Sequence, residues 1–186
     1  MYSFGALSGL SLLCVPDGSF RLYASSGGTD IVTLVSKDLV HWGSDDGSMT
    51  AQGISWDGGA PDLGAGNVMS DMCVAAIGGG YVLCYTVTNP ADPWRGYIGC
   101  ATASAPQGPW TDKGELLSSS VSGIKAPCNP FVTTREDGAP LMVFGSAEGV
   151  FVQRLSADTL ELDGEAQIIA SEVFCAPRLA RHGEVW

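Results

Sequence analysis

Three positions along the chain share one spacing, and one of them carries a carboxylate. Each lies nine residues before a turn glycine: Asp71 before Gly80, Asn129 before Gly138, and Gly9 before Gly18. An ionised aspartate only accepts hydrogen bonds, so Asp71 is a candidate for general-base or ligand-binding chemistry. The other interpretation is a turn or strand-end aspartate that bonds nearby backbone N–H groups.

Cys175 and Glu172 are further candidates for chemistry. Cys175 would act as a nucleophile only with a base such as His182 beside it and a lowered pKa. His182 lies next to the expected turn at Gly183, far along the same strand, which disfavours this pairing. Glu172 lies three residues before Cys175, and side chains alternate along a strand, so we expect it to be a surface glutamate.

The cysteines do not form a pattern typical of metal sites. They are widely spread and include no C-x-x-C pair: Cys14, Cys73, Cys84, Cys100, Cys128 and Cys175. No zinc site is predicted from such spacing, no metal ligand is assigned, and we expect no cofactor. Reduced, buried cysteines that act as small apolar side chains are the favoured interpretation.

The elements that would position these residues form an internal repeat. Four segments share the order apolar run, glycine turn, apolar run: LSLLCVPDGSFRLYAS, MCVAAIGGGYVLCYTV, NPFVTTREDGAPLMVFGS and CAPRLARHGEVW. The first three continue with a third run and then a short fourth run, GISWDG, GELLSS or AQIIAS. These runs are rich in Val, Ile, Tyr, Phe and Thr, and turn residues separate them, which predicts short antiparallel strands.

Four strands in each repeat of roughly 45 to 60 residues are typical of a β-propeller blade. We expect one all-β domain, with blades at residues 5–60, 66–122 and 124–171 and a partial fourth blade at 172–186. Because a propeller closes its ring and an open one exposes sheet edges, the sequence is expected to be a fragment. A β-sandwich is the alternative fold.

Composition restricts the partners of this protein. A net charge of −11, from 20 acidic and 9 basic residues, repels phosphate backbones and anionic lipid, so we expect no nucleic-acid or membrane partner. A neutral or cationic ligand fits better. No basic residue precedes Arg21, and no apolar segment approaches the ~20 residues of a membrane helix, so we expect no secretory signal and a cytoplasmic location.

Three motifs follow one another in a recognisable order. SKDLVHW matches the pattern S-x-D-L-x-x-W, and IGCATASAPQGPWTDKGEL matches A-x-S-x-x-P-x-G-P-W. NPFVTTREDGAPLMVFGS is similar to D-P-x-x-F-x-D-x-D-G-x-x-Y-L-x-x-G-S. Together they resemble glycoside hydrolase family 43, the arabinanase, arabinofuranosidase and xylosidase group. The resemblance implies a five-bladed propeller, of which three blades and the start of a fourth are present.

The resemblance also implies three carboxylates at the propeller axis, since inverting hydrolysis needs an acid and a base roughly 6.5 to 9.5 Å apart. Residue by residue, the pKa-setting aspartate falls on Asn129 and the general-acid glutamate on Cys175. The general base falls on Gly9, or on Leu10 with one gap. None of these is a carboxylate. Asn129 cannot carry the negative charge that raises a neighbouring pKa, and Cys175 is a poor proton donor.

The function implied by the resemblance is hydrolysis of arabinose- or xylose-containing glycosides, with an arabino- or xylo-oligosaccharide as the partner. Asp71 is then the surviving candidate carboxylate. The alternatives are a sugar-binding propeller without catalysis and an inactive fragment. A single carboxylate cannot serve as both acid and base, which favours binding over catalysis.

The aromatic residues are the last candidates for a sugar site. Trp42, Trp56, Trp94 and Trp110 could each offer a flat apolar surface for a sugar ring. The resemblance places Trp42 and Trp110 in outer loops and strands, where packing between blades is the favoured role. His41 is expected to be a packing residue at a strand end.

Overall fold

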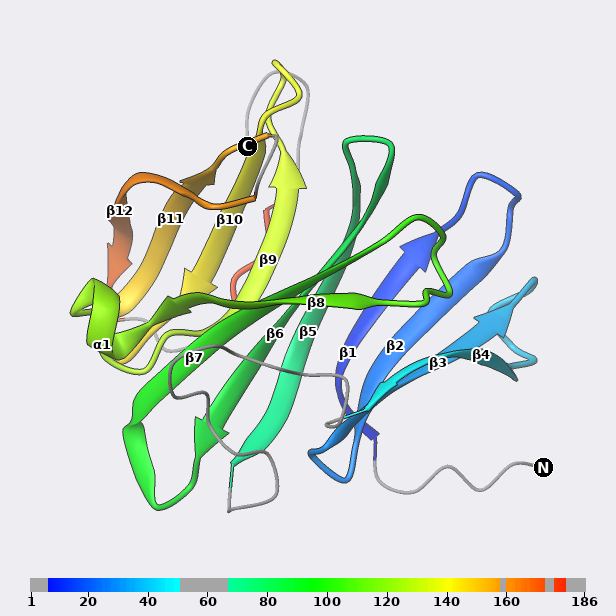
Figure 1. The fold of residues 1–186 in the computed structure, drawn as a ribbon, viewed down its shortest axis with the longest axis horizontal. Helices are drawn as coiled ribbons and strands as arrows, with labels where there is room; N and C mark the ends of the chain where they lie inside the picture. Colours follow the sequence, from blue (N-terminus) through cyan, green and yellow to red (C-terminus); the bar gives the residue numbers. More distant parts are fainter. Residues whose placement is uncertain (1–6, 51–66, 158–159, 173–175, 180–186) are drawn as a thin grey trace.

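The computed structural model describes residues 7–50, 67–157, 160–172 and 176–179. This part of the chain forms three antiparallel four-stranded sheets and one short helix (Figure 1). The elements are β1 (Leu7–Cys14), β2 (Phe20–Ser26), β3 (Asp30–Ser36), β4 (Gly43–Thr50), β5 (Val68–Ile77), β6 (Gly80–Asn89), β7 (Asp92–Ala103), β8 (Thr111–Ser118), α1 (Ser119–Ser122), β9 (Cys128–Thr134), β10 (Pro140–Gly145), β11 (Gly149–Leu155) and β12 (Leu162–Ser171). None of the described helices is long and apolar enough to cross a membrane.

Each sheet is one propeller blade, because its strands follow one another in sequence order and the first strand faces the next blade. β1 lies against β5, and β5 lies against β9, so these three strands form the inner wall (Figure 1). The middle sheet therefore packs on both of its faces. The predicted propeller is confirmed and the sandwich alternative is wrong, since a sandwich would leave one face of each sheet in solvent.

The strands of the middle blade are buried on alternate sides by two different clusters. Leu83 and Tyr85 of β6 pack toward Tyr23 and Ile31 of the first blade. The alternate residues of the same strand join the other cluster, which includes Cys84, Val132 and Phe144. This two-sided burial explains why YVLCYTV reads as a continuous apolar run rather than as an alternating one.

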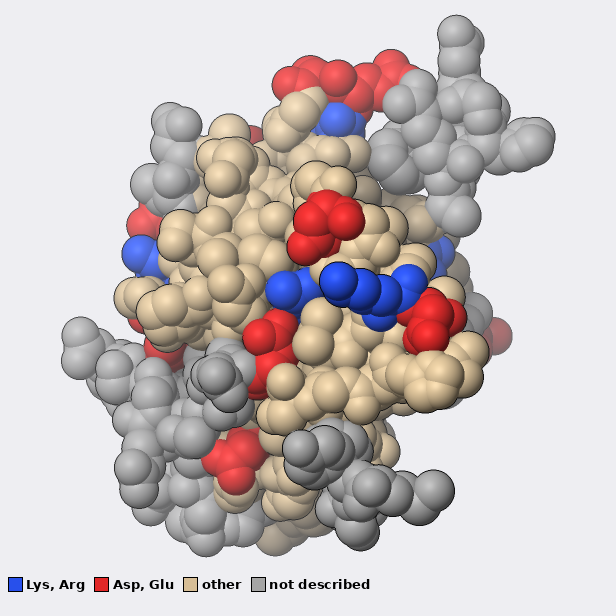
Figure 2. Space-filling view, turned by 90° about the vertical axis from the view of Figure 1, so that its right-hand side faces the viewer, with Lys and Arg blue, Asp and Glu red and all other residues tan. Residues whose placement is uncertain are grey.

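The first blade has one covered face and one exposed face. Leu13 packs against the cluster shared with the middle blade, whereas Leu10 and Leu12 on the other side of β1 are 53% and 55% exposed. Figure 2 views the molecule from the side of this blade and shows Lys and Arg atoms in a short row with Asp and Glu beside them. Arg21 and Asp45 form one ion pair in this blade, with 2.6 Å between Nε and Oδ2.

The fourth strand of the first blade comes earlier than expected. The sequence pattern placed it at GISWDG, residues 53–58, which lie outside the described residues, whereas the structure forms β4 at Gly43–Thr50. A tight turn accounts for the early return of the chain, because Asp38 Oδ1 accepts hydrogen bonds from the backbone N–H groups of Val40 and His41. The polar sequence GSDDGSMT gave no apolar signal for a strand.

A β-bulge interrupts the start of each inner strand. At each bulge, two consecutive residues of the inner strand lie opposite one residue of the partner strand. The bulges lie between Ser8 and Ser11 in β1, between Ser70 and Cys73 in β5, and between Cys128 and Phe131 in β9. The first residue of each bulge has a left-handed backbone: Gly9 (φ 61°), Asp71 (φ 48°) and Asn129 (φ 53°). We call this end of the blades the bulge end, and the end that carries Gly18 and Gly138 the turn end.

The left-handed backbone explains which residue types occupy the bulges. Glycine adopts this conformation without steric cost, and aspartate and asparagine tolerate it better than other side chains. Gly9 has a second constraint, because a Cβ atom there would overlap the backbone nitrogen of Asp71 and lie 2.8 Å from its Cα. The first two inner strands thus touch backbone to backbone at the bulges.

Three cysteines line up across the middle blade. Cys73 lies opposite Cys84, Cys84 lies opposite Cys100, and all three are buried, as expected from the sequence. A hydrogen bond with Cys100 and burial raise the pKa of the Cys84 thiol well above its usual value. The expectation of a buried side chain is wrong for Cys14, which is exposed on the open face of β1, and only partly right for half-buried Cys128.

We expect Gly9→Ala to destabilise the fold much more than Gly18→Ala. Both glycines are left-handed, which costs alanine about 1 kcal/mol, but only Gly9 adds an overlap with backbone atoms, for a total of roughly 3 kcal/mol. Urea denaturation of the two variants measures the difference. Equal midpoints would contradict the close approach of β1 to β5.

We expect iodoacetamide to alkylate Cys14 in the folded protein and to spare Cys73, Cys84 and Cys100 until urea unfolds the chain. Thiolates are the reactive form, and burial raises the pKa of the Cys73 thiol as well as that of Cys84. Mass spectrometry of peptides measures labelling at each site. Fast labelling of Cys84 under native conditions would show that the middle blade is not packed on both faces.

Candidate functional site

Asp71 lies at the bulge end, at the inner edge of the middle blade. Its side chain is half-buried, and the hydroxyl of Ser70 donates a hydrogen bond to Oδ2 over 2.8 Å. The bulge turns Asp71 out of the regular alternation of β5, which places Met72 and Val74 in the core. Ser70 therefore orients a carboxylate that the strand itself does not bury.

Asn129 occupies the same position in the third blade and is held by the middle blade. Its backbone N–H donates to Oγ1 of Thr86 over 2.9 Å, and Thr86 is fully buried. Its side-chain amide donates to the sulfur of Cys128 over 3.2 Å. A threonine on β6 thus fixes the left-handed residue of the neighbouring blade.

Cys128 connects the two positions electrostatically. Burial raises the pKa of its thiol, the hydrogen bond from Asn129 opposes that rise, and the negative charge of Asp71 adds to it. The thiol is therefore neutral at neutral pH and is a weak nucleophile. Among the described residues, no group of three or more His, Cys, Asp or Glu side chains is arranged to hold a metal ion.

Gly9 and Leu10 mark the same position in the first blade, and neither brings an acid to it. The backbone of Asp71 fills the space where a side chain of Gly9 would begin. Leu10 is exposed and lies in the same bulge. Asp71 is the sole carboxylate among the three described bulge positions, and the structure brings Gly9 and Asp71 into direct contact.

The remaining candidates are in the C-terminal part of the chain, and only Glu172 is among the described residues. Cys175 and His182 are not among the described residues, so their assignment stays a prediction. Glu172 is exposed, as expected, and has a left-handed backbone (φ 59°). Ala126, three residues before Asn129, shares this left-handed conformation (φ 49°).

The tryptophan candidates differ in their contacts and in their exposure. Trp110 packs edge-to-face on Tyr23 of the first blade, with 6.0 Å between ring centroids, which confirms its packing role. The indole N–H of Trp42 donates to the carbonyl of Leu39 at the turn end. Trp56 lies outside the described residues. Trp94 is 62% exposed, near the start of β7, at the bulge end.

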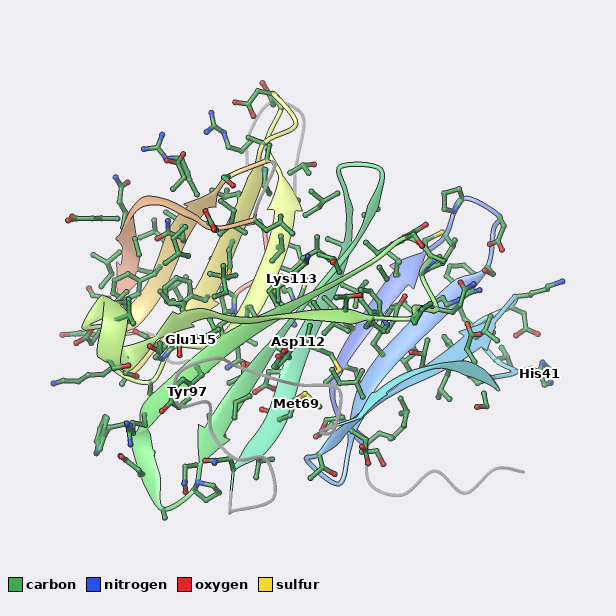
Figure 3. The ribbon with its side chains drawn as sticks, in the orientation of Figure 1. His41, Met69, Tyr97, Asp112, Lys113 and Glu115 are labelled. Carbon is green, nitrogen blue, oxygen red and sulfur yellow. The ribbon has the colours of Figure 1, made fainter. Side chains whose placement is uncertain are left out.

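Two further titratable residues, His41 and Asp112, form side-chain contacts outside the bulge positions. His41 is an exposed turn-end residue whose Nδ1 lies 2.7 Å from Asp38 Oδ2, so the expectation that it packs at a strand end is wrong (Figure 3). The hydroxyl of Tyr85 donates to Oδ1 of Asp112 over 2.7 Å, on the outer strand of the middle blade. Asp112 is therefore a structural partner of a buried tyrosine.

Sequence reasoning missed Ser70 and Thr86. Thr86 accepts a hydrogen bond from Asn129 of the next blade, 43 positions away, and no local sequence pattern predicts such a contact. Ser70 had a weak signal, since a hydroxyl next to a candidate carboxylate is a ready hydrogen-bond donor. The left-handed bulge also had a signal, because glycine, aspartate and asparagine recur at one spacing.

Solved structures with a similar fold include proteins named as arabinanases and as a galactanase. The endo-arabinase from Bacteroides thetaiotaomicron VPI-5482 superposes with a TM-score of 0.70 and 20% identity, over 89% of this chain and 56% of its own. The exo-1,5-α-L-arabinanase from a bovine ruminal metagenomic library gives 0.67 and 18%, over 88% and 54%. The exo-β-1,3-galactanase from Phanerochaete chrysosporium, with β-1,3-galactotriose, gives 0.65 and 18%, over 87% and 38%.

These likenesses show the fold, a five-bladed propeller of which the described residues form three blades. The chain spans about half the length of the two arabinanases. The comparison with curated proteins finds no significant match. The family model for glycosyl hydrolases family 43 matches residues 10–185, which is nearly the whole chain. The chain therefore belongs to glycosyl hydrolase family 43.

Proposed function

We propose that the bulge end binds a sugar residue of a neutral arabinose- or xylose-containing oligosaccharide, and that it does so without hydrolysing it by the paired-carboxylate mechanism. The observation that carries this proposal is the set of three equivalent left-handed bulges, which hold Gly9, Asp71 and Asn129 and so present one carboxylate. The family supports a carbohydrate ligand, because its model matches nearly the whole chain.

The side chains at the bulges suit sugar hydroxyls. The carboxylate of Asp71 accepts hydrogen bonds, and one oxygen remains beyond the bond from Ser70. The amide of Asn129 can both donate and accept. A net charge of −11 disfavours anionic sugars or phosphates, so a neutral ligand fits the surroundings of Asp71 best.

Hydrolysis by inversion requires two carboxyl groups with different protonation states. Asn129 is uncharged, and the close approach of β1 to β5 leaves no space for an acidic side chain at Gly9. Hydrolysis with Asp71 as a relocated carboxylate is the second candidate function. The hydrogen bond from Ser70 favours it, because an acid–base group must be held in one orientation.

We expect Asp71→Asn to weaken binding of arabinotriose or xylotriose about 10- to 100-fold, since a hydrogen bond to a charged group contributes about 1.5–3 kcal/mol. Isothermal titration calorimetry measures the affinities, with β-1,3-galactotriose as a comparison ligand. Asp137→Asn is the matched control, because Asp137 is an exposed turn-end residue paired with Arg135.

Hydrolysis of aryl α-L-arabinofuranoside and aryl β-D-xyloside separates the two candidate functions. We expect binding of the oligosaccharides and no turnover of either aryl glycoside. Turnover that Asp71→Asn abolishes and Asp137→Asn leaves intact would refute the non-catalytic proposal and establish Asp71 as a relocated carboxylate. Equal sugar affinities of the wild type and Asp71→Asn would refute the placement of the sugar at the bulges.

A further inference from the structure

Trp94 is a largely exposed aromatic residue of the middle blade. Eight large apolar side chains are well exposed in the described part of the chain, and Trp94 is the aromatic one among them. It lies near the start of β7, which follows the hairpin at the end of β6. Because β6 runs antiparallel to β5, this hairpin lies at the bulge end, as Asp71 does.

The backbone of Trp94 is fixed to the segment that leads into the third blade. Its carbonyl accepts hydrogen bonds from the N–H of Ala126 over 3.0 Å and from the hydroxyl of Ser119 over 3.3 Å. Two residues further on, Gly96 leaves room for that segment, because a Cβ there would lie 2.5 Å from the carbonyl oxygen of Pro127. The indole is therefore carried by a rigid part of the bulge end.

The same segment connects Trp94 to the candidate site. Ala126 precedes Asn129 by three residues, which span at most about 11 Å of chain. Ala126 and Asn129 both have left-handed backbones, and Thr86 fixes Asn129 on the middle blade. Backbone contacts thus hold the indole-bearing strand at a set position relative to the bulges, within the reach of a short oligosaccharide.

An exposed indole offers an apolar face that suits the C–H face of a neutral sugar ring, while the ring hydroxyls stay in water. Val121 of α1 is 75% exposed, and the hydroxyl of Ser119 in the same helix bonds the Trp94 carbonyl. The bulge end therefore carries exposed apolar side chains on β7 and α1 in addition to the polar groups of Asp71 and Asn129 on the inner strands. A chain of sugars can contact the indole of Trp94 and the bulge residues at the same time, whereas a single sugar ring contacts one of the two places.

We propose that Trp94 forms a second sugar subsite, which binds the ring of an oligosaccharide next to the residue held by Asp71 and Asn129. This inference rests on the proposed function of the bulge end. It specifies the ligand as a chain of neutral sugars rather than a monosaccharide. It assigns Trp94 a role in chain-length preference.

The test is a series of affinities for xylose, xylobiose and xylotriose, and for the matching arabinose series, measured by calorimetry. We expect Trp94→Ala to weaken the trisaccharide roughly 3- to 10-fold and to leave the monosaccharide unchanged. We expect Trp94→Tyr to keep most of the trisaccharide affinity, since the ring can still stack. Val40→Ala, at an exposed position of the turn end, is the matched control.

Two results would overturn the inference while leaving the proposed function intact. One is unchanged trisaccharide affinity in Trp94→Ala. The other is an equal loss for mono- and trisaccharide in that variant, which would indicate a structural effect on the segment around Ala126. If the wild type binds none of these sugars, the proposed function fails together with the subsite. Thermal unfolding of Trp94→Ala confirms that any loss is measured on folded protein.

Discussion

The left-handed bulge at the start of each inner strand is the constraint on which the site depends. Three strands that line the inner wall each place two residues opposite one, and the first of the two must adopt a backbone that few side chains tolerate. Glycine, aspartate and asparagine are the residues found there. The same geometry that limits the residue type also leaves the side chains of Asp71 and Asn129 half-buried rather than in the core.

Packing between blades determines what each bulge can hold. At the first boundary, β1 approaches β5 so closely that Gly9 has no room for a side chain. At the second boundary, Thr86 of the middle blade accepts the backbone hydrogen of Asn129. Asp71 lies between them, with Ser70 as its hydrogen-bond donor. The described bulge positions thus present one carboxylate and one amide.

The repeat predicted most of the architecture because strand patterns and glycine turns are local. It also placed Asp71, Asn129 and Gly9 at equivalent positions through one spacing from the turn glycines. Contacts between blades had no such signal, so the role of Thr86 emerged only from the structure. Cys14 and His41 are exposed because no strand or blade in the described part of the chain covers them.

A crystal structure of the chain soaked with xylotriose or arabinotriose tests most directly whether the bulges form a sugar site. We predict a sugar ring whose hydroxyls lie within hydrogen-bond distance of the Asp71 carboxylate and the Asn129 amide, at the start of β5 and β9. A trisaccharide bound at the turn end, or bound at the bulge end without contact to Asp71, would contradict the claim that the left-handed bulges form the sugar site.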